Sequence, residues 1–441
     1  MTGDGKTKLF ASYGWFYDRF KYELPRGSFG GDFYRRDYFD LFPGDTWNSI
    51  TVGQVIGSFS DPQGGAGCYD ADGNPIDDPT IRIAPGARSR CQFDFRIPSN
   101  AGLGIFVAGE VDPDIKAARQ TEFTAGIERE LGHGLLLRGR YTHKNVDRAI
   151  EDIGVPTASG SEAYIIGNPG FGLADQVASD NGFPSVKAIR KYDALEVQVD
   201  KRFAKSYYFN ANYTFSRLKG NYSGLASSLE FGRVSPNVSR LFDLPWQAFT
   251  LNGESIADGR LPTDRPHVFK FYGAYTANWG GNQSTEFSGF TTMASGTPMT
   301  SVVTLYNLNP TVVEGLGDLG RTETFTQTDF AVRHKIRFAE KYTFVAEMDF
   351  INMFNEQNEL QRQTTISPNN ITGSNLVAYG CAACGGGEIA TINALFGGGI
   401  RDAVLGYLND PAQPLRRQST FNLANGFQTP REIRFGFRLI F

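Results

Sequence analysis

Hydrophobic and polar residues alternate one by one in many segments of this chain, and the pattern is clearest at its end. In REIRFGFRLIF (431–441), every odd position from Ile433 to Phe441 is apolar, and the even positions 432 to 438 carry Glu432, Arg434, Gly436 and Arg438. A period of two places the two sets on opposite faces of an extended strand. The segment therefore predicts a strand with one apolar and one charged face.

The same alternation recurs along the whole chain, and helical periodicity is not sustained anywhere. It predicts about eleven strands, of which two lie near the start, eight in the middle and one at the end. The segments are 6–20, 28–42, 119–131, 134–144, 193–203, 207–216, 266–279, 284–293, 329–338, 342–350 and 431–441.

The links between these strands fall into two kinds. Very short links, such as Gly132-His133 and Lys205-Ser206, join the members of a pair. Long stretches rich in Gly, Pro, Asn, Asp and Ser separate the pairs. Several structureless loops above ~15 residues are uncommon in a compact soluble domain. Outer-membrane barrels combine short periplasmic turns with long external loops. The long stretches are 41–118, 148–190, 221–263, 296–323 and 355–430.

Alternation alone fits two fold classes, a soluble β-sandwich or β-helix and a transmembrane barrel. The strands run about 10–13 residues, which exceeds the usual ~5–6. Aromatic residues such as Tyr342, Phe344, Phe350 and Phe441 stand at strand ends, as in interfacial girdles. We therefore predict an all-β, antiparallel transmembrane barrel, with apolar side chains facing lipid and charged side chains facing a water-filled lumen.

Composition changes this picture little. The 51 Gly, 36 Phe and 19 Tyr suit strands and turns. A net charge of −4 offers no basic field, so we predict no nucleic-acid partner. No run of ~18 apolar residues is present to form a transmembrane helix. The opening MTGDGKTKLFASYGW lacks the apolar core of a signal peptide, so either the protein is cytoplasmic or Met1 is not the natural start.

The end of the chain resembles a known signal. Arg434, Gly436, Leu439 and Phe441 match the C-terminal pattern by which the outer-membrane assembly machinery recognises barrel strands. The whole chain resembles the C-terminal half of a TonB-dependent receptor of the Oar-like branch, which carries an N-terminal carboxypeptidase-regulatory-like domain. The stretches that carry this resemblance are KTKLFASYGWFYDRF, DFYRRDYFDLF, VDPDIKAARQTEFTAGIEREL, DFINMFNEQNEL and TPREIRFGFRLIF.

The resemblance implies the outer membrane of a Gram-negative bacterium and a barrel of ~22 strands around a plug. Residues 1–441 would be a partial barrel domain, because an odd number of strands does not make a complete bacterial barrel. If Phe441 ends the last strand, KTKLFASYGW is about strand 12, and both run inward. The signal peptide, the TonB-contacting segment, the plug and the earlier strands are then expected outside this chain.

The resemblance also implies partners and a function. The partners are outer-membrane lipid, the assembly machinery and, through the N-terminal part, the TonB energy-transducing complex. We expect energy-coupled uptake of a substrate, with 41–118 and 355–430 contributing to its capture. A non-transporting surface protein in adhesion or cell contact is the alternative, and an upstream TonB-contacting segment followed by a plug would favour transport. A soluble carbohydrate-binding β-protein is a third hypothesis, which would require solubility without detergent.

Four cysteines lie in loop-like sequence, as the pairs Cys68 with Cys91 and Cys381 with Cys384. An even number in loops fits disulfides in an oxidising compartment. A four-cysteine zinc site, a thioredoxin-like CAAC motif and free thiols are alternatives that the sequence leaves open.

No catalytic residue, metal site or cofactor is predicted, and we expect that the protein is not an enzyme. Phosphate-binding, metalloprotease and nucleophile-elbow motifs do not occur in the sequence. Glu347 and Asp349 share one strand face, and we expect them to pair with basic residues of 333–337. In DADGNPIDD (70–78), the oxygen-bearing side chains could suit calcium, although a solvated external loop is the favoured interpretation. They are Asp70, Asp72, Asn74, Asp77 and Asp78.

Overall fold

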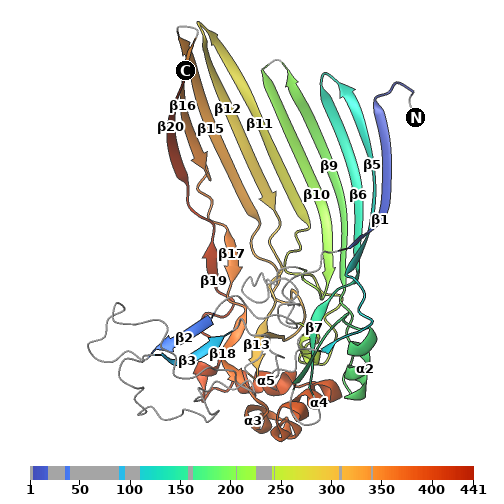
Figure 1. Cartoon of the computed structure of the whole chain (residues 1–441). Helices are drawn as coiled ribbons and strands as arrows, with labels where there is room; N and C mark the ends of the chain where they lie inside the picture. The colour runs from blue at the N-terminus through green and yellow to red at the C-terminus, as the bar shows by residue number, and fades with distance from the viewer. Residues whose placement is uncertain are drawn as a thin grey trace.

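Ten long strands form one antiparallel sheet, which we call the wall (Figure 1). The computed structural model describes residues 3–17, 35–39, 89–94, 110–156, 162–204, 206–224, 241–242, 244–306, 310–338 and 341–441. In spatial order the wall strands are β1 (Thr7–Tyr17), β5 (Arg119–Gly132), β6 (Leu135–Arg148), β9 (Arg190–Ala204), β10 (Tyr207–Gly220), β11 (His267–Gly280), β12 (Gln283–Ala294), β15 (Phe325–Phe338), β16 (Tyr342–Ile351) and β20 (Glu432–Ile440).

Tight turns close one end of the wall, at the top of Figure 1. The turn between β11 and β12 consists of Gly281 and Asn282, both of which have positive φ. Gly and Asn are the residues that tolerate this conformation in a two-residue hairpin. We call this end the turn end and the opposite one the loop end.

The apolar positions of the wall strands fall on a common face because the register keeps them in step. Leu195 of β9, for example, lies opposite Tyr141 of β6 and Phe215 of β10. Large side chains on this face stay exposed, which suits a surface that meets lipid. They include Leu9, Tyr13, Trp15, Phe123, Ile127, Leu137, Leu195, Val197, Tyr213, Phe215, Phe271, Tyr275, Phe287, Met293, Ile433, Phe435, Phe437 and Leu439.

The expected strand at 28–42 is wrong as a part of the wall, which has ten strands instead of about eleven. Within it, Arg35–Phe39 forms the short β2, which pairs with β3 (Ser89–Asp94) in a separate sheet. Arg35, Arg36 and Asp37 are consecutive, so a spanning strand in either register would point at least one charge toward lipid.

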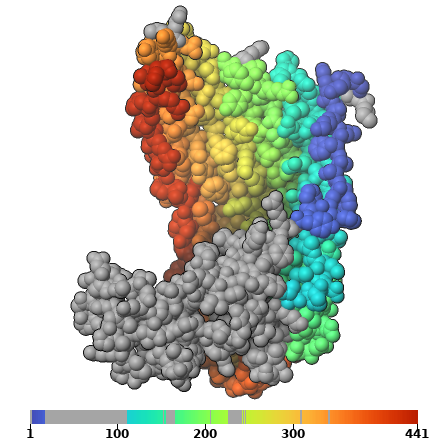
Figure 2. All heavy atoms as spheres, viewed as in Figure 1, coloured from blue at the N-terminus to red at the C-terminus, as the bar shows by residue number. Residues whose placement is uncertain are grey.

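The expected direction of the first strand is also wrong. Thr7 of β1 lies opposite Arg129, near the turn end, so β1 runs toward the loop end. Ile440 of β20 lies opposite Thr343, so β20 runs back to the turn end. The wall therefore has an even number of strands with opposite first and last directions. Among the residues that the structure describes, β1 and β20 have one neighbour each and form the two lateral borders of the wall (Figure 2).

At the loop end, the connections between wall strands fold into a compact unit that we call the loop domain. It comprises the described residues of 149–189, 221–266, 295–324 and 352–431. Its sheets and helices lie beyond the strands at the bottom of Figure 1. Its first sheet consists of β7 (Glu151–Pro156) and β8 (Glu162–Gly167), and β8 also pairs with β4 (Glu110–Val111). The other elements are α2 (Gly172–Asp180), η3 (Pro245–Ala248), β13 (Val302–Leu305), β14 (Pro310–Val312), β17 (Glu359–Arg362), β18 (Thr365–Ile371), α3 (Gly373–Leu376), η4 (Val377–Tyr379), η5 (Ala382–Gly386), α4 (Glu388–Gly398), α5 (Arg401–Leu408), η6 (Pro414–Arg416) and β19 (Ala424–Phe427).

One hydrophobic core joins all four segments of the loop domain. Its fully buried members include Trp246, Leu251, Leu376 and Leu395, and Ile165 and Val303 come from the other two segments. Backbone hydrogen bonds also cross between segments, as from Ile400 N to Leu251 O at 2.8 Å. The loop domain is therefore held by tertiary packing and not by one continuous element.

The glycine runs 385–387 and 397–399 lie at helix ends in the loop domain. The first run continues η5 and ends at Gly387, the N-cap of α4. The second run ends α4, with Gly399 as its C-cap at a φ of 87°. Gly at these positions allows the sharp change of direction at each helix end. None of the helices in the described ranges is both long enough and apolar enough to cross a membrane.

Candidate functional site: the lumenal face of the wall

The face opposite the apolar one carries charged residues that pair across neighbouring strands, and we call it the lumenal face. Arg138 of β6 lies 3.6 Å from Glu128 of β5 and 3.3 Å from Asp200 of β9. Nearer the loop end, Lys144 lies 2.9 Å from Glu122. These pairs are partly solvated, so each stabilises the wall by only about 0–1 kcal/mol. Their main consequence is a hydrophilic inner surface.

The ion pairing expected around Glu347 is confirmed for one of the predicted cations. Arg333 Nε lies 3.3 Å from Glu347 of β16, and its Nη1 atom lies 3.6 Å from Glu286 of β12. Arg333 thus bridges three strands. Asp349 lies opposite Ala331 and Arg434, so its nearest cation in the register comes from β20 instead of 333–337.

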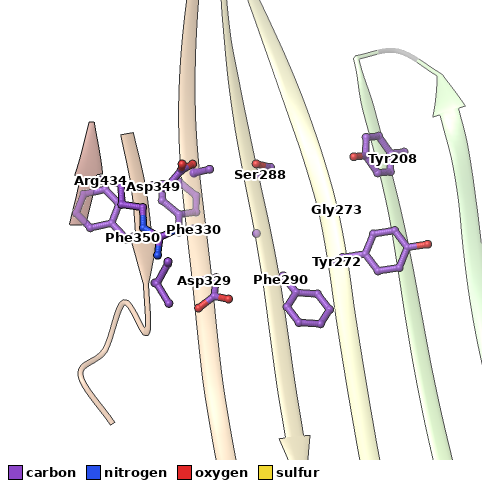
Figure 3. A pocket seen from close by; sticks show the side chains of 13 residues that line it. Tyr208, Tyr272, Gly273, Ser288, Phe290, Asp329, Phe330, Asp349, Phe350 and Arg434 are labelled. Atoms are coloured by element: carbon purple, nitrogen blue, oxygen red, sulfur yellow. The ribbon is translucent and has the colours of Figure 1, made fainter. Parts of the chain in front are cut away.

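A hollow of about 360 Å³ lies against β10, β11, β12, β15, β16 and β20 (Figure 3). Asp329, Asp349 and Arg434 lie toward its β20 side, and Tyr272 and Phe290 lie toward β10. Asp329 already accepts hydrogen bonds from Asn352 N at 2.8 Å and Gln327 Nε2 at 2.9 Å. The hollow is a polar recess with aromatic edges that could contact a passing polar molecule.

The four residues predicted as an assembly signal lie along β20. Arg434 faces the lumenal side and bonds to Glu432 at 2.6 Å. Leu439 lies opposite Phe344 on the apolar face, and Phe441 follows the last residue of the strand at the turn end. A side chain at Gly436 would meet Glu347, because a Cβ there would lie 2.7 Å from Glu347 Oε1. Gly436 therefore has a packing role, and the recognition of these residues by the assembly machinery stays a prediction.

Replacing Gly436 by alanine separates packing from recognition. We expect Gly436→Ala to lower the free energy of unfolding by about 1 kcal/mol, because Glu347 has to move aside. Glu347→Ser in the same chain should restore stability, measured by urea unfolding in detergent. If the assembly machinery recognises Gly436 as predicted, Glu347→Ser should not restore the amount assembled in cells, because removing Glu347 does not restore the recognised residue. Full recovery of assembly in the double variant would show that Gly436 matters for packing and not for recognition.

The cysteines of the loop domain are joined: Cys381 forms a disulfide with Cys384 at the start of η5. Cys68 and the calcium-like segment 70–78 lie outside the described residues, and the side chain of Cys91 is likewise not described. In the part of the chain that the structure describes, no three His, Cys, Asp or Glu side chains gather closely enough to hold a metal ion.

A polar cluster fixes the end of α5 in the loop domain. Tyr379 donates a hydrogen bond of 2.5 Å to Asp410, and Arg416 Nη1 donates one of 2.6 Å to the Tyr379 hydroxyl. The hydrogen bond from Tyr379, followed by one from the backbone of Ala412, lowers the pKa of Asp410 below its ordinary value. The Asp410 carboxylate thereby links the chain after α5 to Tyr379 of η4 and Arg416 of η6.

Sequence reasoning identified which residues face the lumen but not which of them meet. The pairs of Glu128 with Arg138 and of Glu122 with Lys144 depend on the register of strands joined by a turn. The contact of Asp200 with Arg138 depends on strands separated by a connection of more than 40 residues, 149–189. The pairs between β5 and β6 could have been found from the sequence, since counting outward from the turn at 133–134 aligns their charges. The contact between β6 and β9 could not, because no short turn sets the register of these two strands.

Comparison with known proteins gives the family. The family model described as outer membrane beta barrel domain matches residues 5–315. The TonB-dependent transporter Oar of Myxococcus xanthus is 30% identical over 339 residues, which cover 75% of this chain and 29% of that protein. The chain therefore spans less than a third of the length of this relative.

Three solved structures match parts of the chain. The ferric-catecholate import receptor Fiu of E. coli K12 matches at 12% identity and a TM-score of 0.30, covering 57% of this chain and 25% of its own. The ferric yersiniabactin uptake receptor FyuA of Yersinia pestis matches at 10% identity and a TM-score of 0.30, covering 58% of this chain and 27% of its own. The outer membrane transporter YddB of Escherichia coli matches at 10% identity and a TM-score of 0.36, covering 58% of this chain and 31% of its own.

Proposed function

Because the chain belongs to the family of outer membrane beta barrel domains, and so lies in the outer membrane of a Gram-negative bacterium, we propose that it serves energy-coupled uptake as part of a TonB-dependent transporter. In this proposal residues 1–441 supply barrel wall and external loops. A plug and a TonB-contacting segment come from the remainder of a longer protein, as the greater length of the Myxococcus relative supports.

The observation that carries the proposal is the polar character of the lumenal face. The side chains on this face form ion pairs across at least five strands of the wall, including Glu128, Arg138 and Asp200 on one side and Glu286 and Arg333 on the other. An apolar inner face would fill with packed side chains and leave no path. A charged, partly solvated face is suited to enclose water and a polar segment that moves.

The loop domain would make the first contact with the substrate. It lies at the end of the wall opposite both termini (Figure 1), and its core holds the four connections in fixed positions. A rigid outer surface lowers the entropic cost of binding. Of the two loops predicted for substrate capture, 355–430 belongs to the loop domain, and most of 41–118 lies outside the described residues.

TonB dependence can be tested without knowing the substrate. Spent media from the native strain, a deletion of the gene for this protein and a tonB deletion are compared by mass spectrometry. We expect at least one compound that the native strain depletes and both deletions leave behind. Loss of adhesion in the gene deletion, with every compound depleted as in the native strain, would instead support the non-transporting alternative.

A further inference from the structure

A second cavity, of about 590 Å³, lies at the loop end of the lumenal face. Its floor is the wall at β1, β5, β6 and β9, and residues 222–224 after β10 close one side. Arg148 and Arg190 enter it from β6 and β9, and Phe16 and Tyr222 add aromatic surface. We call it the mouth pocket.

Of the arginines that line the mouth pocket, Arg119 is paired with Asp147, whereas Arg148 and Arg190 have no acidic partner among the described residues. Arg148 Nε is buried and has no hydrogen-bond partner. Arg190 donates only to backbone oxygens, to Ser223 O at 2.8 Å and to Tyr222 O at 3.3 Å. Among the described residues that line the pocket, none is Asp or Glu. Lys144 lies two positions before Val146 on the same face of β6. Unlike these two arginines, it has an acidic partner, Glu122, at 2.9 Å.

A second polar atom in the mouth pocket also lacks a partner. Ser223 Oγ is buried without a hydrogen bond, although its backbone oxygen holds Arg190. Buried polar atoms are normally paired, and leaving them unpaired costs free energy. The guanidinium groups of Arg148 and Arg190, together with the unpaired Ser223 hydroxyl, are suited to accept a single anionic group from outside the protein.

We propose that the mouth pocket binds the carboxylate or phosphate group of a small anionic ligand that also carries an apolar or aromatic part. The guanidinium groups of Arg148 and Arg190 would hold the anion, Ser223 Oγ would donate a further hydrogen bond, and Phe16 and Tyr222 would contact the apolar part. This inference rests on the proposed function and deepens it, because it names the chemical class of the substrate. The pocket opens on the lumenal face, so we favour a soluble ligand over a membrane lipid.

Phenyl phosphate is a suitable probe because it combines both features. Its binding to the native full-length protein in detergent is measured by titration calorimetry, with phenol as the uncharged comparison. We expect phenyl phosphate to bind and phenol not to bind at the same concentration. Arg148→Gln and Arg190→Gln should each weaken binding about tenfold or more, because each removes a charge-assisted hydrogen bond. Lys144→Gln, which removes an equal but neutralised charge nearby, should change affinity less than about twofold.

Two arginine variants are used so that a loss of binding can be distinguished from misfolding. Arg190→Gln could disturb the chain at 222–223, whereas the Nε atom of Arg148 has no protein partner to lose. Equal affinity in the native protein and Arg148→Gln would overturn the proposal, as would binding of lipopolysaccharide micelles without binding of phenyl phosphate. Calorimetry does not depend on TonB. If phenyl phosphate does not bind but a compound is still depleted in a TonB-dependent way, only the mouth pocket is rejected. If phenyl phosphate binds but no compound is depleted in this way, only the proposed transport is rejected.

Discussion

Replacing Trp246 by alanine is expected to destabilise the loop domain by roughly 3–5 kcal/mol, which is the usual cost of removing a buried aromatic side chain from a core. Trp246 is only 1% exposed and belongs to the core that joins all four connecting segments. The wall has its own hydrogen-bonded ladders, so it should remain folded. The expected result is a protein with an intact wall and a loosened outer domain.

Hydrogen exchange in the native protein can localise this effect. The amides of Leu251 and Ile400, which link separate segments, should exchange much faster in Trp246→Ala, whereas wall amides keep their rates. Leu415→Ala is the matched control, because Leu415 lies in the same domain at 86% exposure. Equal exchange in the two variants would mean that the loop domain has no shared core.

Arginine in place of Val197 is expected to cost roughly 2–4 kcal/mol of folding free energy in a bilayer, as for a charge near the membrane midplane. Val197 is the central residue of β9, lies opposite Gly139 and Tyr213, and is 40% exposed on the apolar face. An arginine there would place its charge in lipid. The folded fraction, measured by heat-modifiable gel mobility after refolding into vesicles, should fall strongly.

The adjacent residue supplies the control for this substitution. Gln198 occupies the lumenal face and donates a hydrogen bond of 3.0 Å to Asp200, which an arginine could replace. Gln198→Arg should therefore leave the folded fraction nearly unchanged. A larger loss for Gln198→Arg than for Val197→Arg would reverse the assignment of the two faces, and the apolar face would then be an interior one.

Alternation by itself was sufficient to place every wall strand, and it added one segment, 28–42, that does not belong to the wall. Period two is a local property, so all ten strands were recognisable from their own residues, and the C-terminal strand most clearly. The family match confirms the predicted barrel class and the outer-membrane location. The segment 28–42 was misassigned because its aromatic richness resembles a strand, although the charges at 35–37 break the alternation.

The loop domain could not be predicted in the same way. Trp246, Val303 and Leu395 are far apart in the chain, and each stands in sequence rich in turn-forming residues. Such segments have no periodicity of their own, and they become ordered only by burying apolar side chains against one another. The same segments, read singly, looked like structureless loops.

The sequence alone therefore determined the strand positions and the sorting of side chains into an apolar and a charged face, because both follow from the geometry of one extended chain. The tertiary structure decided the partners. The meeting of Arg138 with Asp200, of Arg148 with Arg190, and of the four connections in one core depends on register and packing between distant segments. These contacts are set by the free energy of the whole fold, which no short stretch of residues encodes.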